Sequence, residues 1–434
     1  MTSQTQTAAP SLWRDRTFAV AGLIAVIVAL GFGLIVPVLP LFATHFGVGV
    51  FAAGLVVSVF SAVRLVSNVY TGALSDRIGG RSAIAGGAFI VGVSSLAAAF
   101  APNYWSLVAF RGVGGFGSAL FFNALMALVI ERAPAHRRGQ AVGMLQGAFL
   151  FGISVGPSVG GVLAAPLGLH WPFVIYGVMC GIAGLVAMLL LPREDRGAPT
   201  LQTAEGSEGE PIAAAPSPQR AGWKSMWRSA RELCADRTFA IVLGMMLASR
   251  WAGTGVRFST IPVFADQVVH ADARVIGFAL TLAALTHMIL VVPAGRMIDL
   301  RGRRSLGAPA HIAFAGMVAV LGFATTTPLF LAAMALYGIG TGLTSVVPPA
   351  VVGDVTPPAK TGTAIGVLNT AGDLGSVLGP LVTGLLAERM GYGWGFGASA
   401  ALLLLAGLWG LRMRETLPVH SAKAPDSGAA APAR

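Results

Sequence analysis

The segment GALSDRIGGR, at residues 72–81, decides the fold because a degenerate copy, GRMIDLRGRR, returns at residues 295–304. A shift of 223 residues places Asp76 on Asp299 and Gly79 on Gly302. The same shift carries a further series of glycine, proline and acidic positions of the first half, Glu131, Pro134, Gly139, Gly143, Gly152, Gly156, Pro157 and Gly161, onto Asp354, Pro357, Gly362, Gly366, Gly375, Gly379, Pro380 and Gly384. Chance does not hold one register over so many positions, so we predict a chain built from two similar halves.

The composition indicates what kind of chain these halves form. Of the 434 residues, 55% are hydrophobic and only 11% are charged, whereas a soluble domain has about 25% charged residues. The mean hydropathy is +0.75. These values exclude an ordinary soluble enzyme and predict a polytopic α-helical membrane protein. The apolar runs do not alternate with polar residues, which argues against a β-barrel, and two cysteines argue against a disulfide framework.

Twelve apolar runs are each long enough to cross a bilayer, which takes about 20 residues of helix. They are residues 17–42, 51–74, 83–101, 105–130, 140–165, 171–191, 238–264, 274–298, 305–325, 329–352, 362–386 and 394–413. Each half therefore holds six spans, and because six is even, both halves have the same orientation. The predicted fold is all-α, with two pseudo-symmetric six-helix bundles and a substrate path between them near the middle of the membrane.

The basic residues predict the orientation. Of the 29 Lys and Arg residues, 23 fall in segments on one side, two fall in loops on the other side (Arg274 and Arg389), and four lie within spans. Because loops rich in Lys and Arg stay in the cytoplasm, we expect a multi-pass protein of the plasma (inner) membrane with both termini inside. The same bias accounts for the net charge of +11 without a nucleic-acid partner.

Five segments follow from this topology. They are an N-terminal tail (1–16), the first bundle (17–191), a cytoplasmic linker (192–237), the second bundle (238–413) and a C-terminal tail that we expect to be disordered (414–434). In the linker, residues 222–237 place apolar and basic side chains on opposite sides of a helix. This pattern predicts an amphipathic helix on the inner membrane surface; the alternative is a solvated helix that packs on nothing.

The segment 72–81 resembles the signature loop of the major facilitator superfamily, G-x-L-x-D-R-x-G-R-[RK], and the resemblance covers essentially the whole chain. One departure is Gly80, which stands where a basic residue is usual. The resemblance implies that the loop acts as a conformational latch; its residues here are Gly72, Asp76, Arg77, Gly79, Arg81, Asp299, Arg303 and Arg304. We expect Asp76 to meet the positive N-terminal end of the helix that begins near Thr361. A purely topogenic role would account for the arginines but not for Asp76.

The fifth run contains GISVGPSVGG, which is similar to the G-x-x-x-G-P-x-x-G-G motif of proton-coupled exporters in that superfamily. The motif residues are Gly152, Gly156, Pro157, Gly160 and Gly161. The glycines leave a flat face for close helix packing, and Pro157 removes a backbone hydrogen bond. The alternative is generic membrane-helix packing. With Arg111 in the fourth run, the resemblance points to the twelve-span drug:proton antiporters.

Ionisable residues inside spans are rare and are functional candidates. The candidate substrate and proton path consists of Arg64, Asn68, Arg111, Asn123, Gln146, Arg250, Arg257, His287, Asn369 and Asp373. Asp373 is the only acidic residue well inside a span, and Arg250 lies at a matching depth. We therefore expect Asp373 to pair with Arg250, or with Arg257 two helical turns along the same face. It is either a proton carrier or one partner of a permanent salt bridge.

Two other candidate residues each have two possible roles. His287 is either a proton carrier or a neutral, hydrogen-bonded histidine, and Arg111 either takes part in coupling or only joins helices. The first run holds no acidic residue, although several multidrug relatives keep one there. Arginines therefore outnumber acids in the expected cavity, which favours neutral or anionic amphiphiles over strongly cationic drugs.

The leading functional hypothesis is proton-driven export of small amphiphilic molecules by a monomeric secondary transporter in contact with membrane lipid. The alternatives are a permease or facilitator for a metabolite such as a sugar or organic anion, and a membrane receptor or scaffold without transport. We expect no enzyme activity and no cofactor, because the sequence shows no enzyme signature, and we expect no ATP-driven transport, because it has no P-loop. We also expect no metal site, because the histidines and cysteines show no ligand spacing.

Overall fold

The computed structural model describes residues 15–134, 137–192, 231–357 and 360–416. Within these ranges the chain forms helices and no strands, and twelve helical segments are long and apolar enough to cross a membrane. The elements of the first half are α1 (Arg16–Ile35), α2 (Leu39–Thr44), α3 (Val50–Ile78), α4 (Gly80–Ala99), α5 (Tyr104–Arg132), α6 (Arg138–Leu167) and α7 (Trp171–Leu190).

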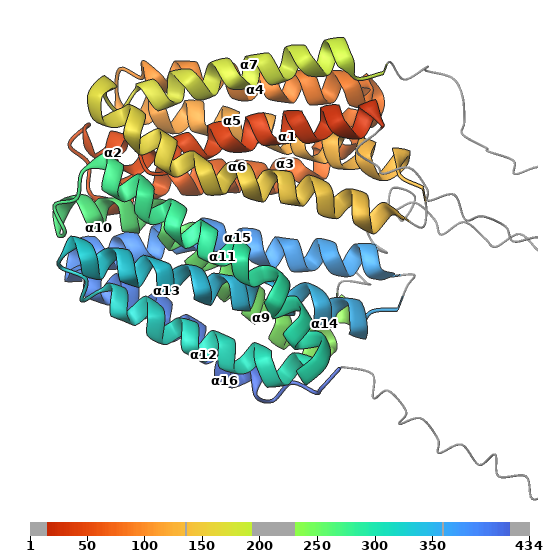
Figure 1. The fold of residues 1–434 in the computed structure, drawn as a ribbon, viewed down its shortest axis with the longest axis vertical. Helices are drawn as coiled ribbons and strands as arrows, with labels where there is room; N and C mark the ends of the chain where they lie inside the picture. The colour runs from red at the N-terminus through yellow and green to blue at the C-terminus, as the bar shows by residue number, and fades with distance from the viewer. Residues whose placement is uncertain (1–14, 135–136, 193–230, 358–359, 417–434) are drawn as a thin grey trace, which may run out of the picture.

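The second half repeats this plan. Its elements are α9 (Arg237–Arg250), the π-helix η4 (Trp251–Thr260), α10 (Ile261–Gln267), α11 (Ala273–Arg301), α12 (Arg303–Leu321), α13 (Thr327–Ser345), α14 (Val347–Val355), α15 (Thr361–Met390) and α16 (Tyr392–Gly410). Each half of the chain forms its own bundle, and the two bundles lie side by side (Figure 1). The predicted twelve-span, two-bundle fold is confirmed.

The sequence repeat is also a structural repeat. Both ends of α11 lie 223 residues after the ends of α3, and α15 has the same relation to α6. The glycines that end α3 and α11, Gly79 and Gly302, have φ angles of 89° and 100°. These positive angles suit glycine because it has no Cβ. Glycine therefore allows the same sharp turn in both copies of the 72–81 segment.

Three predicted spans are interrupted in the structure. Residues 17–42 divide into α1 and α2 around Pro37, and residues 329–352 divide into α13 and α14 just before Pro348. Proline cannot donate a backbone hydrogen bond, so a helix commonly ends or bends beside it. The third interruption is η4, which replaces the regular α-helix in the middle of the span 238–264.

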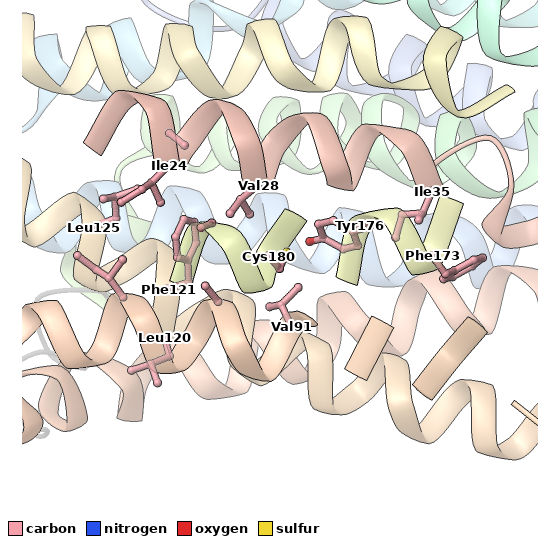
Figure 2. Close-up of a cluster of buried hydrophobic side chains, with 14 of the residues drawn as sticks. Ile24, Val28, Ile35, Val91, Leu120, Phe121, Leu125, Phe173, Tyr176 and Cys180 are labelled. Carbon is pink, nitrogen blue, oxygen red and sulfur yellow. The ribbon is translucent and has the colours of Figure 1, made fainter. Parts of the chain in front are cut away.

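Within the first bundle, apolar side chains of α1, α4, α5 and α7 meet in a continuous core (Figure 2). α6 packs on α1 through its glycines. A Cβ added to Gly156 would lie 2.5 Å from the Cα of Gly33, and one added to Gly160 would lie 2.1 Å from the carbonyl oxygen of Leu34. Small residues permit this approach, which stabilises membrane helices through close van der Waals contact.

The two bundles meet along two pairs of helices, α3 with α15 and α6 with α11. We call the end at which α1 begins and α16 ends the tail end, and the opposite end, near α2 and α10, the far end. Figure 1 shows the bundles close together at the far end and farther apart at the tail end. Near the far end, Gly161 and Gly384 lie against the opposite bundle, whereas near the tail end Gly143 and Gly366 have nothing within 4 Å of an added Cβ. The structure is therefore a conformer that is closed at the far end and open at the tail end.

Specific contacts seal the far end. Between α3 and α15, Ser58 Oγ donates a 2.7 Å hydrogen bond to the carbonyl oxygen of Val377, and the Phe51 N–H donates to Glu388 Oε2 at 2.8 Å. Between α6 and α11, the Ser158 N–H donates to Thr281 Oγ1 at 3.0 Å. These bonds hold the halves together from the far end toward the middle of the membrane.

Several sequence predictions lie outside the described residues. The linker helix at 222–237 is described only from residue 231, and residues 231–235 are helical. The two tails are described only in part, at residues 15–16 and 414–416.

Candidate substrate and proton site

A cavity of about 140 Å³ lies between the bundles and takes its walls from α1, α2, α3, α5, α6, α9, η4 and α15. Its lining residues of interest are Phe32, Phe60, Arg64, Arg111, Arg250 and Phe258. Pockets for drug-sized ligands usually measure about 300–1,000 Å³. In this conformer the cavity therefore suits a molecule of one or two rings, and a larger one requires the bundles to move.

An ion pair between the two halves borders this cavity. Arg64 on α3 donates from Nη2 to Asp373 Oδ1 on α15 at 3.1 Å. Its side chain is 37% exposed and that of Asp373 is 17% exposed. The predicted partners of Asp373, Arg250 or Arg257, are therefore wrong for this conformer. Matching depth along the membrane does not say which helices are neighbours, and α15 lies against α3 as well as α9.

Arg250 nevertheless belongs to the same site. It lines the cavity beside Arg64, and the charges of Arg64 and Asp373 act on it. Its Cγ would lie 3.0 Å from a Cβ added to Gly372 on α15. No hydrogen bond or ion pair joins Arg250 to another residue in the part of the chain that the structure describes. Its guanidinium is thus available to a ligand.

Arg257 faces a different environment from Arg250, against our prediction of a shared helix face. It is 5% exposed, donates from Nη2 to the carbonyl oxygen of Leu280 at 2.5 Å, and does not line the cavity. The reason is η4, which contains Arg257. In a π-helix the hydrogen bonds run from residue i to i+5, so each turn takes more residues and a spacing of seven no longer returns to the same face.

Arg111 on α5 lines the cavity and is 2% exposed. Its guanidinium lies over the ring of Phe60, with Cζ 4.4 Å from the ring centroid. A cation–π contact of this kind stabilises the charge without using its N–H groups. Nε and Nη1 of Arg111 have no hydrogen-bond partner in the described ranges.

The amide candidates divide into two groups. Asn123 on α5 donates from Nδ2 to Thr71 Oγ1 at 2.8 Å and to Asn68 Oδ1 at 3.3 Å, both on α3. This network joins helices of one bundle. Gln146 on α6 and its repeat equivalent Asn369 on α15 are both exposed on the tail-end side of Asp373 and its equivalent position. Among the described residues, no hydrogen bond joins Gln146 or Asn369 to Arg64 or Asp373, although Asn369 lies one helical turn from Asp373 on α15.

His287 on α11 is partly buried and outside the cavity lining. Its Nε2 lies 3.4 Å from Ser345 Oγ on α13, within the second bundle. This contact fits the hydrogen-bonded alternative, while the charges of Arg250 and Arg257 both reach the ring.

Three aromatic residues of the cavity wall were absent from the prediction. Phe32 on α1 lies 5.9 Å from Phe60 and 6.4 Å from Phe258 between ring centroids, and these rings come from both bundles. Phenylalanine inside an apolar span is indistinguishable in sequence from a core or lipid-facing residue. Of the three, only Phe258 had a hint in the sequence, because it directly follows the candidate residue Arg257.

The two copies of the 72–81 segment have different surroundings at the tail end. In the second copy, Arg303 bonds to Asp299 and donates from Nε to Asp354 Oδ2 at 3.0 Å, and Glu415 accepts the Arg303 N–H at 2.6 Å. The position equivalent to Arg303 in the first copy is Gly80. Asp76 and Arg77 are exposed there. The contact of Asp76 with the N-terminus of α15 stays a prediction.

Comparison with known proteins identifies the family. The model of the major facilitator superfamily matches residues 21–267 and again residues 243–433. The chain belongs to this superfamily. Its members are transporters of small molecules, so the chain is a multi-pass membrane transporter.

Individual relatives share about a quarter of their aligned residues with this chain. An uncharacterized transporter of the same superfamily from Methanocaldococcus jannaschii is 24% identical over 87% of this chain and 93% of its own length. The quinolone resistance protein NorA of Staphylococcus aureus is 26% identical over 38% of this chain and 42% of its own length.

Two solved structures have the same fold. A bacterial homolog of the human lysosomal transporter Spinster, solved in an inward-facing and unoccupied conformation, superposes with a TM-score of 0.73 at 16% identity and covers 93% of this chain and 97% of its own. The human organic anion transporter MFSD10 superposes with a TM-score of 0.61 at 21% identity and covers 92% of this chain and all of its own.

Proposed function

We propose that this transporter exports small amphiphilic molecules in exchange for protons. The observation that carries the proposal is the Arg64–Asp373 ion pair, which joins the two bundles beside the cavity between them. Similarity to NorA over part of the chain and the glycine motif of α6 support export. We further propose that the tail end faces the cytoplasm, that the protein resides in the plasma membrane, and that it acts as a monomer.

The ion pair acts as a lock on the empty transporter. With Asp373 charged, its attraction to Arg64 adds to the far-end bonds between α3 and α15 and keeps the far end closed. A proton on Asp373 removes the negative charge and with it the ion pair. The far end then separates at a lower free-energy cost, so that the unloaded and unprotonated transporter is the form that does not change sides.

A transported molecule in the cavity releases the same lock, because the cavity is bordered by Arg64 itself. A polar group of the molecule competes with Asp373 for the guanidinium. Binding of a proton or of a substrate thus permits the bundles to move. Both bind beside α3 and α15, the helices that separate. This arrangement couples the two fluxes through one pair of side chains.

Two alternatives remain distinct from this proposal. A metabolite permease or facilitator of the same fold would move its substrate without a proton gradient. A receptor or scaffold would move nothing. The described cavity between bundles that are open at one end favours transport over the last alternative.

Flux measurements on liposomes test the proposal. The purified protein is reconstituted, a pH gradient is imposed, and uptake of a series of amphiphilic compounds is followed together with the internal pH. We expect accumulation that depends on the gradient and a matching movement of protons. Flux that does not depend on the pH gradient would reject antiport and favour the facilitator. The absence of any flux would favour the receptor or scaffold.

A further inference from the structure

We infer that the transported molecule is an anionic amphiphile, a compact aromatic or aliphatic acid whose acidic group binds Arg111 and Arg250. The inference rests on the proposed function and names the chemical class that its cavity accepts. It starts from an imbalance of charge: the described lining includes three arginines and no acidic residue. Only one of these arginines, Arg64, has a carboxylate partner, Asp373.

The imbalance is most costly at Arg111, because Arg111 is buried whereas Arg250 is exposed. A guanidinium out of contact with bulk water loses hydration, and burial without a counter-charge is unfavourable. Arg111 is 2% exposed and keeps two N–H groups without a partner in the described part of the chain. The stacking of Arg111 on Phe60 fixes its plane while leaving those donors unused. Both nitrogens are closed off in this conformer, so acceptor oxygens of an occupant reach them only when Arg111 or the bundles move, whereas the positive charge of Arg111 already acts on an occupant of the cavity that it lines.

The shape of the donors identifies the occupant's acidic group. A guanidinium presents N–H groups in a planar fork that matches the two oxygens of a carboxylate, or those of a sulfonate or phosphate. Arg250 adds a second fork that no described side chain engages. A strongly cationic molecule would be repelled by the charges of Arg111 and Arg250, and a neutral one could accept hydrogen bonds but would bring no counter-charge.

The rest of the wall identifies the remainder of the molecule. Phe32, Phe60 and Phe258 form a contiguous aromatic surface from both bundles. Aromatic and aliphatic groups bury favourably on such a surface. With a volume of about 140 Å³, the cavity fits a ligand of one or two rings. The acid would also lie near Arg64 and compete there with Asp373, which connects its binding to the ion pair.

Equilibrium binding to the full-length protein in lipid nanodiscs tests the inference. The probes are 2-naphthoate, 2-naphthamide and 2-naphthylmethylammonium, which share one ring system and differ in charge. We expect 2-naphthoate to bind at least about tenfold more tightly than the amide, the factor that one charge-assisted hydrogen bond contributes. The ammonium compound should bind most weakly.

Variants assign the preference to the arginines. Arg250→Gln should weaken 2-naphthoate binding about tenfold and leave amide binding unchanged. Arg111→Lys, which keeps the charge but loses the planar fork, should also weaken the acid selectively. The matched control is Arg274→Gln at the exposed far end of α11, which should change neither. Because Arg250 borders a cavity, its variant should fold even if a change at the buried Arg111 does not.

The inference is overturned if the amide or the ammonium compound binds as tightly as 2-naphthoate, if no carboxylate binding saturates, or if Arg250→Gln weakens acid and amide equally. Failure here is separable from failure of the proposed function. Proton-driven flux of neutral or cationic compounds, without binding of acids, would support antiport and reject the anion site. Selective binding of acids without proton-driven flux would support the anion site and reject antiport.

Discussion

The far-end and tail-end parts of α6 and α11, and of α3 and α15, differ in the surroundings of their glycines. At the far end, a Cβ added to Gly161 would lie 2.1 Å from the carbonyl oxygen of Ala273, and one added to Gly277 would lie 2.3 Å from that of Pro157. At the tail end, Gly143 and its repeat equivalent Gly366 have nothing within 4 Å of an added Cβ.

This difference says what the tail-end glycines are for. Glycine lowers helix stability by about 1 kcal/mol relative to alanine, and its usual benefit in membranes is the close approach of another helix. Gly143 and Gly366 have no such neighbour in this conformer. We therefore expect them to pack against the opposite bundle when the tail end closes, as Gly161 and Gly277 pack now.

The largest expected effect comes from filling these two kinds of position. Gly161→Leu cannot accommodate Ala273 and Gly277 of α11, so it should hold the far end open and abolish transport. Gly143→Leu should also abolish transport, but by holding the tail end open. Accessibility of single cysteines to a membrane-impermeant reagent added at each end distinguishes the two outcomes.

A matched control is Gly181→Leu on α7, which also has nothing within 4 Å and lies away from the contact between the bundles. It should transport normally. If Gly143→Leu behaves like Gly181→Leu, the tail-end glycines are not closing surfaces.

The next largest effect is expected at the Arg64–Asp373 pair, between the far end and the tail end, where proton and substrate transport should lose their coupling. Asp373→Asn mimics the protonated carboxyl and removes the ion pair, so uphill transport driven by a pH gradient should disappear while downhill exchange of substrate persists. Arg64→Gln also breaks the pair but keeps the titratable group, so its transport should still respond to pH. Flux assays at several pH values compare the two. Wild-type accumulation by Asp373→Asn would show that the proton is carried elsewhere, and His287 would be the next residue to test.

A smaller effect is expected at the far-end edge of the α3–α15 contact. Glu388 accepts the Phe51 N–H in the first turn of α3, which has no side-chain cap of its own. Loss of such a cap costs about 0.5–2 kcal/mol. Glu388→Ala should therefore raise the population of the far-end-open conformer several-fold, measured by cysteine accessibility. Arg389→Gln, one residue further on, is the control and should leave the population unchanged.

The smallest effect concerns the latch at the tail end. Asp76→Asn should weaken a contact between carboxylate and helix dipole by roughly 0.3–1 kcal/mol, shift the equilibrium toward the tail-end-open conformer and reduce the transport rate. Asp299→Asn is the informative comparison, because Asp299 bonds to Arg303 within one bundle. That variant should lower thermal stability without changing the conformer balance. Equal transport by Asp76→Asn and wild type would contradict the latch.

The repeat made much of the fold predictable. A common offset of 223 residues gave two equivalent halves, and α3 and α11 follow that offset at both ends. The breaks beside Pro37 and Pro348 had a local cause in the sequence. The π-helix η4 had none, because WAGTGVRFST carries no local signal for a change in hydrogen-bond register. The error about Arg257 follows directly from that missing information.

The site was predictable in its residue types and not in its pairings. The cost of burying charge singled out Arg64, Arg111, Arg250 and Asp373, and the structure places the arginines around one cavity and pairs Asp373 with one of them. Depth along the membrane could not choose between Arg64 and Arg250 as the partner, because that depends on which helices touch. The aromatic wall was invisible, since a phenylalanine in an apolar span has no distinctive neighbours in sequence.

The central claim is that neutralising Asp373 opens the far end and closes the tail end as one movement. Distances between spin labels test it on a single pair of helices, α6 and α11. One label pair replaces Leu167 and Arg274 at the far end, and another replaces Gln140 and Leu300 at the tail end, all exposed positions. The exposed Cys234 is first changed to serine.

Both label pairs are measured in the background with and without Asp373→Asn, at neutral and at acidic pH. The account predicts that Asp373→Asn, or acidification with Asp373 intact, lengthens the Leu167–Arg274 distance and shortens the Gln140–Leu300 distance together. Acidification should have no further effect in Asp373→Asn. Distances that do not change, or that change in the same direction at both ends, would contradict the claim that this ion pair controls the alternation.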